Sequence, residues 1–211
     1  PSVVADGAGP AARTVAHDGW LRSQWFELVG LQAAFDAAYE AMIQAVDRRD
    51  RLDAAITRMA ADSEFTDVVN RLCCLRGVST LTGFGLAVEI GDWTRLDGHR
   101  IGAYVGLTPS ESSSGASRAL GGITKTGNGH ARRLLIEAAW HHRPAYRPTS
   151  PIMRARWDRA SAAARARGHA GNQRLHDRWV GFQVRKKRSV VANAAIAREL
   201  AGWCWSLAVM T

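Results

Sequence analysis

The stretch that decides the fold and raises the question of function runs from Gly106 to Trp140: GLTPSESSSGASRALGGITKTGNGHARRLLIEAAW. Its first half holds a serine cluster closed by a glycine. Its second half holds glycine turns, one lysine, two adjacent arginines and an apolar helix pattern. From Ser112 to Ile136 there is no aspartate or glutamate. Small hydroxyl residues, exposed backbone amides and basic side chains without a nearby carboxylate can bind a phosphodiester. A serine oxygen can also attack phosphorus. The stretch therefore indicates nucleic-acid binding, nucleic-acid chemistry, or both.

The serine cluster comprises residues 112–114, directly before Gly115. A serine nucleophile must be activated, and neither a Ser-His-Asp order nor a GxSxG motif surrounds it, so a hydrolase is poorly supported. Phosphoryl transfer needs mainly positioning and charge stabilisation. A Ser-Ser-Ser-Gly run is also a common flexible loop, and that interpretation stays open. The bases that would supply the charge are Arg118, Lys125, Arg132 and Arg133.

The glycine turns lie directly before a predicted helix at 131–142. Backbone amides of residues 121–128, the ammonium of Lys125 and the helix N-terminus would converge on an anion, as in an anion nest. The stretch is not a P-loop, since GxxxxGK[ST] is absent. A plain turn with Asn128 as cap explains the same residues, and we keep both interpretations.

Outward from this stretch, the patterns are mostly helical. Apolar residues spaced by three and four, with no glycine or proline from 31 to 61, predict a long amphipathic helix over 29–61. An ordinary bundle helix is the alternative. We expect a mainly α protein in three parts: an irregular N-terminal segment at 1–28, the long helix at 29–66, and a compact domain at 67–211. Further helices are predicted at 66–74, 98–107, 152–179 with a break at Gly168, and 189–210. Residues 109–129 are expected to be mostly loop, with a short β-ribbon at 119–124.

Residues 75–90 resemble a helix–hairpin–helix element. In such an element the backbone at the start of the second helix faces a phosphate. Gly77 and Val78 match the hairpin, whereas Ser79 replaces its second glycine and Arg76 its proline. Ser79 would still cap the following helix. A purely structural helical hairpin is equally compatible.

Charge is divided unevenly along the chain. Residues 1–111 carry 10 Lys and Arg against 15 Asp and Glu, whereas residues 112–211 carry 18 against 4. So basic a half favours nucleic-acid phosphate, because each neutralised phosphate releases counterions. A solvated basic surface is the alternative. The densest basic run precedes the last predicted helix and comprises Arg185, Lys186, Lys187 and Arg188.

The remaining composition argues against several classes of protein. Three cysteines at 73, 74 and 204 lack metal-ligand spacing and indicate a reducing compartment. His141 and His142 are adjacent, with no carboxylate at ligand spacing, so no metal site is expected. There is no signal-peptide pattern and no apolar run of about 18 residues. We expect a cytoplasmic protein with no membrane partner.

Several motifs together resemble one family of bacterial insertion-sequence transposases. GLTPSESSSG, GGITKTGN and HARRLLIEAAW are similar to its C-terminal transposase domain, and LRGVSTLTGFGLAVEIGDW and RELAGWCWSLAVM extend the similarity over about 18–210. Members of that family join a RuvC-like, four-carboxylate domain through a coiled coil to the serine-bearing domain. They are described as serine recombinases guided by a bridge RNA.

The resemblance implies roles for particular residues and partners. The serine before the glycine matches the nucleophile position, so Ser114 is the first candidate and Ser113 the second. The 29–66 segment becomes a coiled-coil remnant, which implies a homo-oligomer. DNA and a guide RNA are the implied partners. The four-carboxylate site has no match in this chain, so a divalent metal is expected only in that absent domain and no cofactor in this one.

The best interpretation is therefore DNA transposition by a chain that supplies the serine and is incomplete alone. A first alternative is a non-catalytic nucleic-acid-binding module in which the serines form a loop. A second is a structural oligomerisation piece built around the long helix.

Overall fold

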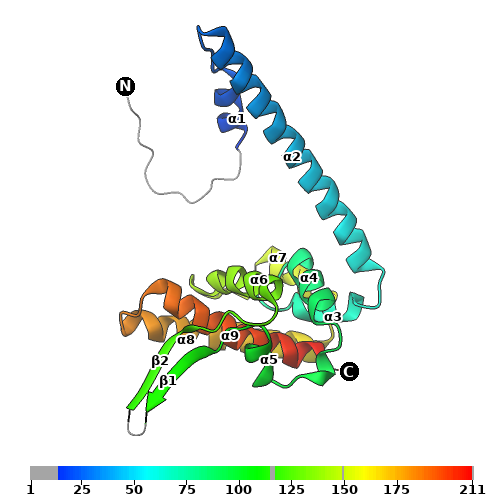
Figure 1. Cartoon of the computed structure of the whole chain (residues 1–211). Coiled ribbons are helices and arrows are strands. Elements are labelled where there is room, and N and C mark those ends of the chain that lie inside the picture. The colour runs from blue at the N-terminus through cyan, green and yellow to red at the C-terminus, as the bar shows by residue number, and fades with distance from the viewer. Residues whose placement is uncertain (1–13, 115–116, 149, 211) are drawn as a thin grey trace. The chain divides into compact units, whose positions relative to one another are not determined.

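The computed structural model describes residues 14–114, 117–148 and 150–210, and it divides the chain into two compact units, 1–52 and 53–211. The elements are drawn in Figure 1. Unit 1 contains helix α1 (Val15–Arg22) and most of α2 (Val29–Ala61). Within the described residues of unit 2, the α-helices are α3 (Thr66–Leu72), α4 (Thr80–Ile90), α5 (Arg100–Tyr104), α6 (Gly129–Ala139), α7 (Pro151–Trp157), α8 (Ala162–Val184) and α9 (Ser189–Ala208). Two 3-10 turns, η1 (Trp93–Arg95) and η2 (Trp140–His142), and strands β1 (Pro109–Ser114) and β2 (Ser117–Ile123) complete it. The mainly α prediction is confirmed.

Unit 1 is held together by local contacts. Thr14 caps α1 by accepting from the His17 amide at 3.1 Å. The Tyr39 hydroxyl on α2 donates to Asp18 at 2.8 Å and accepts from Arg22 at 3.0 Å, which joins the two helices. Helix α2 begins and ends at the predicted residues. Of the irregular segment predicted at 1–28, residues 1–13 lie outside the described part, whereas residues 15–22 form helix α1, so the prediction is wrong there.

Helix α9 is the centre of unit 2. Its apolar face is buried against α8, α6, α5 and α3, which places Ile196, Leu200 and Leu207 fully out of solvent. Figure 1 shows α8 and α9 lying side by side along the unit, with ribbon β1–β2 leaving it as a two-stranded arm. This packing buries a continuous core of Leu, Ile, Val, Ala and Trp side chains, which supplies most of the stability.

Two details of the predicted secondary structure are wrong. The break expected at Gly168 lies instead at residues 158–161, between α7 and α8. Gly168 is inside α8, where an added Cβ would stand 2.5 Å from the Cβ of Cys74, so the glycine serves close packing. The region 109–129 is also less irregular than predicted. An antiparallel ribbon begins at Pro109 rather than near Ala119, with a bulge between Pro109 and Glu111.

Candidate nucleic-acid interface

The serine cluster lies on a strand rather than in the expected loop. The backbones of Ser113 and Arg118 are register partners, as are those of Ser114 and Ser117, near the tip of the ribbon. The side chains of residues 112–120 lie outside the described part, and so does Gly115. The candidate nucleophiles Ser113 and Ser114 are therefore on β1, and Arg118 is opposite Ser113 on the adjacent strand β2.

The base of the ribbon is tied to the α5 end by backbone hydrogen bonds. The amide of Thr124 donates to the Thr108 carbonyl at 2.9 Å, that of Lys125 to Gly106 at 3.1 Å, and that of Asn128 to Tyr104 at 3.1 Å. These three amides are consequently turned toward the protein. The anion nest predicted at 121–128 is wrong to that extent, although the exposed Lys125 side chain remains available.

Asn128 is occupied by structural contacts. Its Oδ1 caps α6 by accepting from the Ala131 amide at 2.8 Å, and its Nδ2 donates to Glu89 Oε2 at 2.7 Å. His130 Nδ1 lies 2.7 Å from the other Glu89 oxygen. The hydrogen bonds from Asn128 and then from His130 lower the pKa of Glu89 below its usual value. The alternative turn-and-cap interpretation therefore accounts for Asn128.

The adjacent arginines differ in their surroundings. Arg132 is half-buried, and its Nη1 donates to the carbonyls of Val105 at 3.0 Å and Thr126 at 3.1 Å, which holds the ribbon base against α6. Arg133 is exposed and pairs with Glu137 one turn later at 3.2 Å. Arg133 can thus meet a solvent-side phosphate, whereas Arg132 positions the backbone beneath the ribbon.

Gly77 is placed by packing. Its φ is +83°, and an added Cβ would stand 2.3 Å from the Ala138 carbonyl oxygen of α6. Ser79 caps α4 as predicted, accepting from the Thr82 amide at 3.2 Å. The close approach of α6 explains the glycine without a ligand, which favours the structural interpretation of this hairpin.

The basic run lies in the exposed turn between α8 and α9, as predicted. Lys186 has φ +52°, and the Lys187 amide donates to the Phe182 carbonyl at 3.0 Å, which closes the turn. The guanidinium groups of Arg185 and Arg178 lie 5.1 and 5.5 Å, respectively, from the centre of the Phe182 ring. The run ends with Arg188 as the N-cap residue of α9.

Sequence reasoning missed a row of arginines on α8. Residues 167, 174, 178 and 185 are separated by seven, four and seven positions, which puts them on one face of a helix. The spacing is present in the sequence, but the alternating Arg and Ala residues of this segment made one face hard to distinguish from the others. In unit 2 this face runs beside α9 and continues into the basic run at 185–188.

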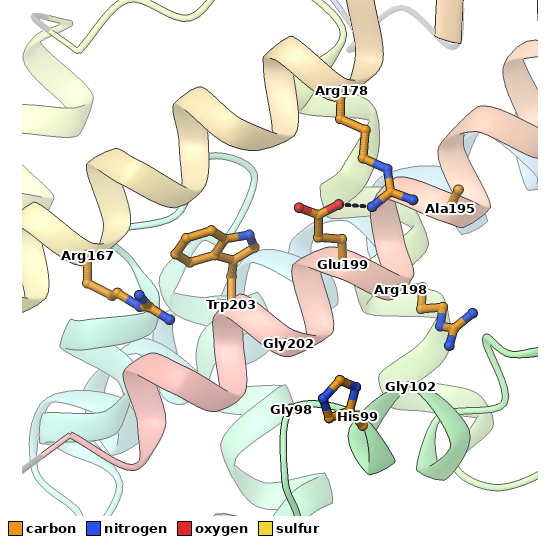
Figure 2. A pocket seen from close by; sticks show the side chains of 10 residues that line it. All are labelled: Gly98, His99, Gly102, Arg167, Arg178, Ala195, Arg198, Glu199, Gly202 and Trp203. Atoms are coloured by element: carbon orange, nitrogen blue, oxygen red, sulfur yellow. Dashed lines mark hydrogen bonds and ion pairs between the residues drawn. The ribbon is translucent and has the colours of Figure 1, made fainter. Parts of the chain in front are cut away.

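A groove lies along this arginine row, between α8, α9 and α5 (Figure 2). Its volume is about 430 Å³, and glycines at 98, 102 and 202 form part of its wall. Glu199 pairs with Arg174 at 3.1 Å and also with Arg178. Arg198 is exposed, and the aliphatic part of its side chain packs against Gly102. A Cβ added to Gly102 would stand 3.2 Å from the Cγ of Arg198.

Aromatic stacking holds the far end of the groove. The Arg167 guanidinium lies 4.5 Å from the centre of the Trp203 ring and donates to Ser206 at 3.0 Å. Glu199 is the single carboxylate among the described residues that line the groove, and Arg167, Arg178, Arg198 and His99 also line it. The groove therefore presents fixed, net positive charge, which suits a phosphate backbone.

Among the described residues, no group of three His, Cys, Asp or Glu side chains is close enough to hold a metal ion. All three cysteines are free and buried. None of the described helices is both long enough and apolar enough to cross a membrane.

Residues 69–158 match the family described as Transposase IS116/IS110/IS902 family. The chain is related to insertion-sequence transposases. The matched residues include the ribbon, the Gly77 hairpin and α6, but end before α8 and α9.

Individual relatives match over longer stretches. A Sinorhizobium fredii protein that bears a transposase name, y4qE, is 32% identical over 95% of this chain and 48% of its own length. The transposase for insertion sequence element IS1533 of Leptospira borgpetersenii is 28% identical over 83% of this chain and 51% of its own. That for IS1328 of Yersinia enterocolitica is 28% identical over 74% and 39%. The chain thus spans about half the length, or less, of these relatives.

Proposed function

We propose that this chain acts in DNA transposition as the serine-bearing part of an insertion-sequence transposase. The observation that carries the proposal is the position of the serine strand. β1 and β2 leave unit 2 beside a cavity lined by Pro109, Gly121 and Gly122 of the ribbon, by Arg178 of α8 and by Arg198 of α9. Phosphate held along the arginines would therefore lie at the base of β1, the strand whose far end carries Ser113 and Ser114. The relationship to transposases supports the same reaction.

In the proposed step the Ser114 Oγ forms a bond to a backbone phosphorus while the bond from phosphorus to one sugar oxygen breaks. The serine proton ends on that departing sugar hydroxyl, so the step is balanced and needs no oxidant or reductant. Arginine and lysine stabilise the charge on the phosphoryl oxygens. A guide RNA, a divalent metal in a separate carboxylate domain, and oligomerisation belong to the same proposal through the family resemblance.

DNA binding is tested by its dependence on salt. Each phosphate contact adds about −0.7 to −0.9 to the slope of log affinity against log salt. Alanine at Arg185, Lys186, Lys187 and Arg188 should flatten that slope measured by fluorescence anisotropy, with unfolding unchanged. The matched control replaces four exposed arginines of α2 and should leave the slope unaltered: Arg48, Arg49, Arg51 and Arg58. Absence of binding at about 50 mM salt would contradict the binding proposal.

The nucleophile is tested by trapping covalent protein–DNA adducts on a nicked substrate, with the carboxylate domain and guide RNA supplied in trans. Ser114→Ala should abolish the adduct, and Ser113→Ala should reduce it less. DNA affinity should persist, and stability should change by less than about 0.5 kcal/mol. Mass spectrometry should find the modification on Ser114. An adduct that survives Ser114→Ala moves the assignment to Ser113 or Ser112. A system that transposes without ever modifying these serines makes the chain a non-catalytic binding module.

A further inference from the structure

A cavity of about 860 Å³ opens at the base of the ribbon, between β2, α6 and the start of α9. Its volume is within the range of about 300–1,000 Å³ typical of ligand pockets. Much of its lining is apolar. The apolar side chains include Leu107, Ile123, Ile136, Val190, Val191 and Ala194.

Two of these side chains are exposed to an unusual degree for their type. Val190 is 59% exposed and Val191 is 54% exposed, on consecutive positions of the first turn of α9. Exposed β-branched side chains grouped at a cavity mouth mark a surface that gains free energy when it is covered. Further along α9, nine residues are buried in the core of unit 2, so these two valines are the exposed apolar part of the helix.

The rim of the cavity is basic. Lys125, Arg178 and Arg198 line it, and Arg178 is paired with Glu199, which is not among the described lining residues of this cavity. The backbone amide of Lys125 is used by Gly106, but its side chain is exposed. Arg178 and Arg198 also line the groove along α8, so the cavity and that groove share a wall.

An apolar lining beside basic side chains matches the chemistry of a single nucleotide. A base has a flat apolar face, and the phosphates on either side of it are anionic. Enzymes that take a base out of the stack hold it between apolar or aromatic side chains in such a pocket. An acidic amphipathic peptide would also bring negative charge to the basic side chains. It would require a longer apolar contact than this one cavity offers.

We propose that this cavity binds an unpaired base of a nucleic-acid strand, with the flanking phosphates on Lys125, Arg178 and Arg198. The inference rests on the proposed function in that the strand lies on the same basic face. It adds a preference for distorted DNA. Extruding a base costs least where it is already unpaired, so a bulge should bind more tightly than a perfect duplex.

The test compares the affinity of the full chain for a duplex carrying one bulged nucleotide with that for the fully paired duplex. The wild type should prefer the bulge about tenfold, the size expected when one base gains a protein contact. Ala194→Trp, which fills the cavity, should remove the preference while leaving paired-duplex affinity unchanged. Ala194→Leu should remove part of it. 2-Aminopurine placed in the bulge should be shielded from acrylamide by the wild type and not by Ala194→Trp.

The matched control is Ala170→Trp, an exposed position of α8 that lines none of these cavities, and it should keep the full preference. Equal wild-type affinity for bulged and paired DNA would overturn the proposal, as would a preference that Ala194→Trp leaves intact in a folded protein. A change of oligomeric state in Ala194→Trp, seen by sedimentation, would assign the cavity to a second copy instead. If paired duplex does not bind, the proposed function fails by itself. A single-stranded oligonucleotide sensitive to Ala194→Trp would still support the cavity.

Discussion

Helices α2 and α9 differ sharply in how many of their residues are buried. α2 has 33 residues and buries only Ala60, whereas α9 has 20 residues and buries nine, among them Ile196 and Leu200. Both have apolar positions at helical spacing, yet α2 leaves Leu31 48% and Leu52 55% exposed. The pattern that makes a helix does not decide whether that helix belongs to a core.

The difference also indicates what each helix is for. Helices gain most of their stability from packing an apolar face, because propensity alone is marginal in water. α2 has local support such as the Gln32–Asp36 hydrogen bond at 2.8 Å, but little cover. We propose that a second copy of α2 covers it, as the coiled-coil resemblance implies. α9, in contrast, already has its cover within unit 2.

The largest expected effect comes from shortening one buried side chain of α9. Leu200→Ala should destabilise unit 2 by about 2–5 kcal/mol, because it removes packed atoms and leaves a cavity. Leu52→Ala, the same change at an exposed α2 position, should cost less than about 0.5 kcal/mol in the monomer. Urea unfolding of both variants checks the pair. Equal losses would contradict the contrast.

A smaller effect should come from a buried histidine in unit 2. Burial, and then the charges of Arg76 and His141, lower the pKa of His142 from 6.5 to about 3. Below pH 6.5, His142 therefore binds a proton in the unfolded chain but stays neutral in the folded chain. The free energy of unfolding decreases as pH falls. The loss should reach about 3 kcal/mol by about pH 4, at roughly 1.4 kcal/mol per pH unit.

The check is the pH dependence of urea unfolding for His142→Gln, which should lose most of that slope. His99→Gln replaces an exposed histidine and should keep it. A slope that is the same in wild type and His142→Gln would show that other groups cause the acid sensitivity.

The smallest effect on unit 2 should come from breaking α2. Ala45→Pro removes a helix hydrogen bond and should cost that helix about 3 kcal/mol, while unfolding of unit 2 stays unchanged. If α2 is an assembly arm, sedimentation should show a loss of oligomer with only a modest loss of helical circular dichroism. A wild type and a variant that are both monomeric would instead make α2 an ordinary helix.

Local pattern was enough to predict much of the secondary structure. The bounds of α2, the Ser79 cap of α4 and the position of the basic run before α9 all follow from spacing within a few residues. Such features depend on helical periodicity and on side chains bonding to their own backbone, both of which are properties of a short segment. The serine strand was missed because a polar, glycine-containing ribbon lacks the alternation that marks a half-buried strand.

The candidate site was less predictable, since it depends on approaches between distant segments. Asn128 and Arg132 were predicted to contact nucleic acid. In the structure Asn128 donates a hydrogen bond to Glu89, and Arg132 donates one to the carbonyl of Val105. Nothing near them in the sequence announces those partners.

The sequence by itself therefore determined the helices, the basic half and the serine motif that joins this chain to transposases. Only the tertiary structure decided which bases stay available, because a polar group is free or used according to what the folded chain brings within about 3 Å of it. It brought the arginines of α8 beside Arg198 of α9, at the foot of the serine ribbon. That placement depends on burying the apolar face of α9, a requirement shared by residues scattered from Leu72 to Leu207.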